Sequence, residues 1–89
     1  MLEEFEQVQT HEYLHEQGVA LSLNCIGENH RMAAWHLREA MNFHDQAATA
    51  FDAGNLEAMK LHKKSAKLHH YQAFEYSTMA ERIASNLNF

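Results

Sequence analysis

Residues 47–66, which read AATAFDAGNLEAMKLHKKSA, carry the signals that decide the fold. Gly54 supplies the left-handed position that commonly ends a helix, and Asn55 is a favoured N-cap residue for the helix that follows. The chain contains no proline and only three glycines, which favours helix on both sides. These features predict two helices joined by a tight turn at residues 54–55.

Alanines recur every seven residues on each side of this turn. The repeat comprises Ala33, Ala40 and Ala47 before it, and Ala66, Ala73 and Ala80 after it. A strict seven-residue repeat keeps one stripe of a helix facing its partner, and alanine allows the two backbones to approach closely. We therefore predict helices over residues 29–53, with Asn29 as N-cap, and over residues 56–87, packed as an antiparallel hairpin.

The N-terminal part gives a weaker pattern. Apolar residues at helical spacing predict an amphipathic helix over residues 3–17, with Gly18 as its stop. Residues 19–26 fit either a continuation of that helix or an extended connector, and Gly27 ends the segment in both cases. The expected organisation is a single domain of residues 1–89, with an arm and connector over 1–27 and a hairpin over 28–89.

The predicted class is all-α, and the core is small. A chain of 89 residues leaves a large part of its surface exposed. One hairpin closed by alanines also leaves Trp35, Phe43, Phe74 and Ile83 without an evident cover. We therefore expect a helical bundle formed by a homodimer, or by this chain with another protein.

Charge is distributed unevenly along the chain. Twelve acidic and seven basic residues give a net charge of −5, and residues 1–18 contain five glutamates and no lysine or arginine. Four of the bases lie within eight positions, at Lys60, Lys63, Lys64 and Lys67. The acidic segment docks on this basic stretch, or both are solvated charge runs. The net negative charge argues against a nucleic-acid partner.

Compartment is inferred from what the sequence lacks. Cys25 is the only cysteine, so no intrachain disulfide is possible. The acidic N-terminus does not have the basic and apolar regions of a signal peptide, and no apolar run approaches the ~20 residues of a membrane span. We expect a cytoplasmic protein that does not enter the membrane.

The string His11-Glu12-Tyr13-Leu14-His15 admits two metal interpretations. It matches the HExxH pattern of zinc proteases, but Glu16 follows it and a helical chain offers no substrate-binding sheet. The pair Glu12 and His15 also fits the Glu-x-x-His unit of di-iron bundles, whose second copy a homodimer would supply. Alternatively, these side chains form a solvent-facing pair one turn apart.

Four histidines of the hairpin form a second candidate metal site. His36 is expected nearly level with His70, and His44 with His62, because each pair is nearly equidistant from the turn. Neutral imidazoles suit Zn, Cu or Ni. The alternative is that the rings only cover the alanine seam while a ring nitrogen reaches water.

Residues 47–66 resemble the helix-turn-helix of tetratricopeptide repeats and of microtubule-interacting-and-trafficking hairpins, through their alanines, their aromatic residue and the Gly-Asn turn. The segment 29–87 also resembles small Ala- and His-rich bacterial hairpin proteins of uncharacterised role. These resemblances imply a helical interaction hairpin and carry over no functional residues.

No nucleophile, phosphate-binding loop or cofactor motif is recognisable, so we expect no catalytic residues and no organic cofactor. The sequence favours a protein-interaction or self-assembly module without catalytic activity. The alternative is a metal-binding helical bundle with Fe or Zn held by histidine and glutamate.

Overall fold

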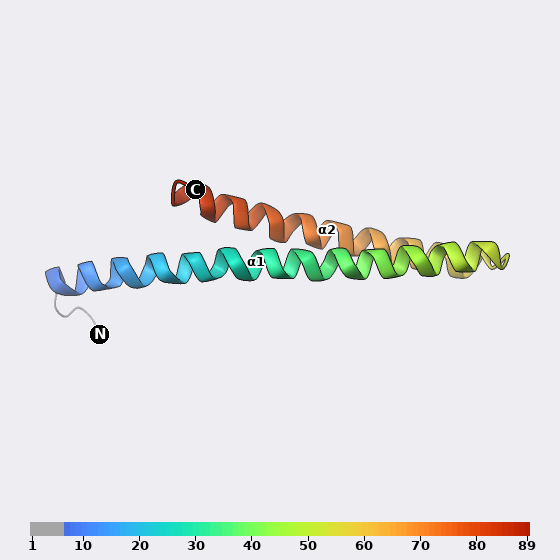
Figure 1. Cartoon of the computed structure of the whole chain (residues 1–89), viewed down its shortest axis with the longest axis horizontal. Helices are drawn as coiled ribbons and strands as arrows, with labels where there is room; N and C mark the ends of the chain where they lie inside the picture. The colour runs from blue at the N-terminus through green and yellow to red at the C-terminus, as the bar shows by residue number, and fades with distance from the viewer. Residues whose placement is uncertain (1–6) are drawn as a thin grey trace.

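The computed structural model describes the backbone of residues 7–89 and the side chains of residues 24–89. This part of the chain forms two helices, α1 (Gln7–Asp52) and α2 (Leu56–Asn86), and contains no strand. Figure 1 shows α2 folding back along the C-terminal part of α1. The predicted all-α hairpin is confirmed.

The turn between the helices has the predicted residues in the predicted roles. Gly54 has φ +77°, and its N–H donates to the Phe51 carbonyl at 2.9 Å. The Asn55 N–H donates to the Ala50 carbonyl at 2.8 Å, which completes a Schellman motif at the end of α1. The Asn55 side-chain oxygen then accepts from the Ala58 N–H at 3.1 Å and caps α2.

Three boundaries predicted in the N-terminal third are wrong, because α1 runs without interruption through Gly18, Gly27 and Asn29. Residues 19–26 are therefore helical, and residues 3–6 of the predicted arm lie outside the described part. One glycine inside a helix costs about 1 kcal/mol relative to alanine, which a helix of 46 residues can absorb. Asn29 does not cap; its side-chain amide donates to the Cys25 carbonyl at 2.8 Å.

The interface between the helices is a seam of small side chains. The buried hydrophobic residues of the described part are the six predicted alanines, Ala33, Ala40 and Ala47 of α1 and Ala66, Ala73 and Ala80 of α2. We call this set the alanine seam. His36 is also buried, and no large side chain in the described part is fully buried. The seam therefore fixes the pairing of the helices while burying little apolar area.

The hairpin is a rod with unequal arms. The 46 residues of α1 and the 31 residues of α2 correspond to about 69 Å and 47 Å of helix. The longest dimension of the molecule is 68 Å. These lengths differ by about 22 Å, and Figure 1 shows the N-terminal part of α1 extending past the end of α2. Within residues 7–89, no helical stretch is long and apolar enough to cross a membrane.

Candidate functional site

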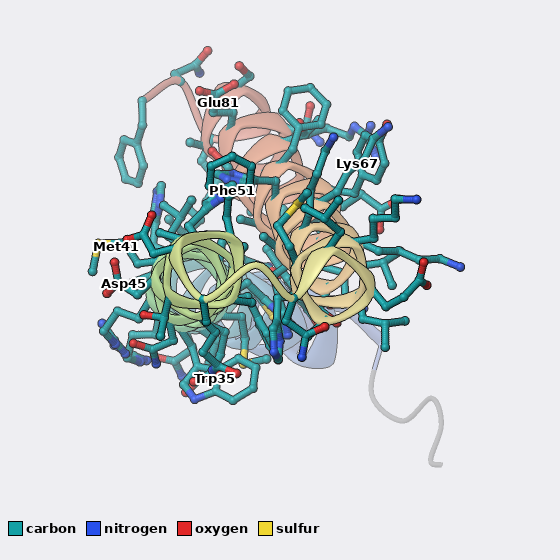
Figure 2. The ribbon with its side chains drawn as sticks, turned by 90° about the vertical axis from the view of Figure 1, so that its right-hand side faces the viewer. Trp35, Met41, Asp45, Phe51, Lys67 and Glu81 are labelled. Carbon is teal, nitrogen blue, oxygen red and sulfur yellow. The ribbon has the colours of Figure 1, made fainter. Side chains whose placement is uncertain are left out.

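The alanine seam divides the hairpin into two sides, and the offset of a residue from the preceding seam alanine decides its side. His36 and Phe43 follow seam alanines by three residues, whereas Leu37 and His44 follow them by four. Side chains three and four residues on from a buried position flank it on opposite sides. Viewed along the hairpin axis, Trp35 and Phe51 lie on opposite sides of the helix pair (Figure 2).

The side with the offset of three carries a ladder of rings that alternates between the helices. The His36 ring stacks on Tyr76, with ring centroids 5.6 Å apart, and Phe43 stacks on His69 at 5.6 Å and on His62 at 6.2 Å. We call this set the ring ladder. Its contacts join α1 and α2 from the middle of the seam toward the turn, so it supplements the small apolar contribution of the alanines.

A hydrogen bond between two histidines lies within the ring ladder. His36 Nδ1 and His69 Nδ1 are 2.8 Å apart, and His36 is only 7% exposed. One ring must carry the proton on Nδ1 and the other must accept it there. The edge of Trp35 packs against both rings, with centroids at 4.9 Å and 5.8 Å. This bond satisfies the one polar side chain that the described part buries.

The side with the offset of four holds an open groove of about 470 Å³. Seam residues Ala33 and Ala73 form its floor, and Leu37 and Phe74 line its walls. These two side chains are 50% and 71% exposed. We call this feature the Leu37–Phe74 groove. It is an apolar concave surface without a cover in the described chain, which is typical of a docking site.

A second pair of histidines stands on the same side as the groove. His44 Nε2 and His70 Nε2 are 3.3 Å apart, with ring centroids at 5.4 Å, and both side chains are exposed. His70 also lines the Leu37–Phe74 groove. The two nitrogens converge from different helices at a point open to solvent.

The histidine pairing predicted from distance to the turn is wrong for both pairs. His36 contacts His69 rather than His70, and His44 contacts His70 rather than His62. Distance from the turn gives the level of a histidine along the hairpin, but not the side of the seam on which its ring lies. His62 instead stacks on Phe43. His69 was not predicted as a site residue, although its three-residue offset from Ala66 matches that of His36 from Ala33.

The candidate ligands His11, Glu12 and His15 belong to α1, but their side chains lie outside the described residues. They remain a prediction. Among the residues with described side chains, no group of three or more histidine, cysteine, aspartate or glutamate residues is arranged to hold a metal ion. The histidine contacts of the hairpin are therefore pairs.

The basic residues predicted to cluster do so near the turn. Lys60, Lys63, Lys64 and Lys67 are exposed within the first four turns of α2. Lys60 lies 4.0 Å from the Glu57 carboxylate, and the Lys67 ammonium lies 6.0 Å from the centre of the Tyr71 ring. These are weak surface interactions, so most of the positive charge faces solvent.

Large apolar side chains are exposed along the whole hairpin. Those with at least 45% of their surface exposed are Trp35, Leu37, Met41, Phe51, Leu56, Leu61, Leu68, Tyr71, Phe74, Met79 and Phe89. Isolated exposed apolar residues are ordinary, but here they are numerous on a molecule whose described core is made of alanine.

No protein-family model, curated protein or solved structure matches the chain.

Proposed function

We propose that this chain is a helical self-association module, in which a second copy covers the Leu37–Phe74 groove. The observation that carries the proposal is the contrast between a core of six buried alanines and large apolar side chains left exposed on both helices. Two hairpins packed groove to groove would form a four-helix bundle with a larger apolar core. Such an arrangement buries the same surface on both copies, as a two-fold dimer requires.

Charge favours a second copy in the antiparallel orientation. The five glutamates of residues 1–18 belong to the N-terminal end of the chain, while the four lysines lie beside the turn. The start of α1 and the turn are at opposite ends of the 68 Å rod (Figure 1). Two antiparallel rods would bring the start of α1 of each copy, which includes Glu12 and Glu16, near the lysines of the other, which favours this orientation over the parallel one.

The experiment compares the molecular mass of three chains in solution by size-exclusion chromatography with light scattering. The unmodified chain is expected at twice the chain mass at micromolar concentration. Leu37→Gln combined with Phe74→Gln is expected at the chain mass, with unchanged helix content, because both side chains are exposed in the single hairpin. Removing apolar contacts from the centre of an interface typically weakens binding by more than tenfold.

The matched control is Leu61→Gln combined with Leu68→Gln. These leucines are 66% and 55% exposed and lie outside the set of residues that lines the groove. The control is expected to remain dimeric. A monomeric unmodified chain, or a control that dissociates while the groove variant stays dimeric, would refute the assignment of the groove as the interface.

A further inference from the structure

We infer that His44 and His70 form a two-histidine site for a divalent transition metal, bridging α1 and α2. The evidence is the convergence of two exposed ring nitrogens from different helices, at 3.3 Å. The inference goes beyond self-association, because a single hairpin already contains both ligands.

The separation of the two nitrogens matches that of two ligands on one tetrahedral ion. Zinc binds imidazole nitrogen at about 2.0–2.1 Å, so two such nitrogens at the tetrahedral angle lie about 3.3–3.4 Å apart. By contrast, N–H hydrogen bonds usually have donor–acceptor distances of about 2.7–3.2 Å. The 3.3 Å between His44 Nε2 and His70 Nε2 is at the long end for a hydrogen bond, and it lets both nitrogens bind one ion without a change in their separation.

The pair formed by His36 and His69 differs from this one in the separation of its nitrogens and in its burial. The Nδ1 atoms of His36 and His69 are 2.8 Å apart, which is hydrogen-bond distance, and His36 is buried beneath Trp35 and Tyr76. A metal ion there would have to separate the nitrogens and displace the rings that cover them. The two pairs therefore have separate roles, with structural bonding within the ring ladder and metal binding on the groove side.

The chemistry of the site limits the ions that it takes. Two neutral imidazoles suit Zn²⁺, Cu²⁺ and Ni²⁺, and are poor ligands for Mg²⁺ or Ca²⁺, which prefer oxygen. In the single hairpin, water completes the coordination, because the described side chains supply no third ligand group and both rings are exposed. A metal that joins the helices binds the folded hairpin more tightly than the unfolded chain, so it raises the stability of the hairpin.

The test is the thermal unfolding of untagged protein, followed by circular dichroism with and without Zn²⁺ or Ni²⁺, and with a chelator to reverse the effect. We expect the metal to raise the midpoint by several degrees, as an added stability of about 1 kcal/mol does in a chain of this size. Mg²⁺ should have no effect. His44→Asn, His70→Asn and the double variant should each lose most of the rise, since one imidazole alone does not bridge the helices.

The matched control removes a different pair of histidines. His11→Asn combined with His15→Asn deletes a separate predicted pair of histidines, four positions apart within α1, and should keep the metal-dependent rise. The Leu37→Gln, Phe74→Gln chain should keep it as well, which separates metal binding from self-association. A rise that survives in the His44, His70 double variant, or one that disappears in the His11, His15 variant, would overturn the inference.

Discussion

His36 and His44 show how a one-residue difference in offset from the seam changes the surroundings of a side chain. His36 follows Ala33 by three residues and is buried in the ring ladder, where His69 is its hydrogen-bond partner. His44 follows Ala40 by four residues and is exposed beside the groove. A buried polar group that loses its partner costs free energy, whereas an exposed one finds water.

We expect His69→Ala to lower the free energy of unfolding by about 1–3 kcal/mol, because it leaves a buried ring nitrogen of His36 without its partner. His44→Ala removes one member of the exposed pair and should change stability by less than about 0.5 kcal/mol in the absence of metal. Urea unfolding followed by circular dichroism measures both. If His69→Ala and His44→Ala lower the free energy of unfolding by the same amount, the hydrogen bond between His36 and His69 gives no stability beyond that of the exposed pair.

At the scale of the helices, the sequence predicts what depends on a repeated or strongly local signal. The seven-residue alanine repeat identifies the six buried alanines of the seam. Gly54 and Asn55 identify the turn, because Gly54 adopts the positive φ that ends α1 and the Asn55 side chain caps α2. Gly18, Gly27 and Asn29 carry the same local signals but lie within α1. Helix formation is cooperative, so a single glycine or asparagine does not end a long helix when no turn motif follows it.

The candidate site was predictable only in part. The residue types and their presence on the hairpin follow from the sequence, but the contacts require the side of the seam as well as the distance from the turn. Side chains also lean toward the N-terminus of their helix, which shifts residues that are level on the backbone. His44 therefore reaches His70, and His62 is left to stack on Phe43.

The seam predicts how substitutions at alanine behave. Ala40 is 1% exposed, so Ala40→Leu forces extra atoms between closely packed helices and should cost about 1–3 kcal/mol of stability. Ala48→Leu makes the same change at an exposed position of the same helix and should be within about 0.5 kcal/mol of the unmodified chain. Chemical denaturation of both variants is the measurement. A stable Ala40→Leu hairpin would mean that the helices are not in close contact there.

Glycine to alanine should have opposite effects at two positions. Gly54 has φ +77° with no atom within 4 Å of an added Cβ, so Gly54→Ala should destabilise the hairpin by about 1 kcal/mol through the backbone alone. Gly27 is inside α1, where the nearest atoms to an added Cβ are Arg31 guanidinium nitrogens at 3.5 Å. Gly27→Ala should stabilise by about 0.5–1 kcal/mol. Thermal unfolding measures the change in stability of both variants. A Gly27→Ala chain that is less stable than the unmodified chain would contradict a continuous helix through residue 27.

At the scale of the whole molecule, the hairpin is a 68 Å rod with lysines near its turn at one end and the start of α1, which includes Glu12 and Glu16, at the other. Its alanine seam closes the pair of helices and leaves the large apolar side chains exposed. The proposed pair of antiparallel copies would account for both features, because groove packing would supply a core and the charged ends would favour that orientation.

This account predicts that salt weakens the dimer. Screening of exposed charges is strong at about 0.5 M salt, so the dissociation constant should rise several-fold from low salt to that concentration. Lys63→Gln combined with Lys64→Gln should weaken the dimer at low salt and reduce its salt dependence. Arg38→Gln removes one positive charge at an exposed position of the other helix, α1, and is the control that should leave both unchanged. The measurement is the dissociation constant of each chain at low and high salt, from dilution series. A dissociation constant that does not change with salt would contradict the prediction.

Self-association is the central claim, and sedimentation equilibrium of the unmodified, metal-free chain tests it most directly. The account predicts twice the chain mass at micromolar concentration, with dissociation on dilution accompanied by a lower unfolding temperature. A fully helical chain that sediments at the chain mass across the micromolar range, and unfolds at a temperature independent of concentration, would contradict it.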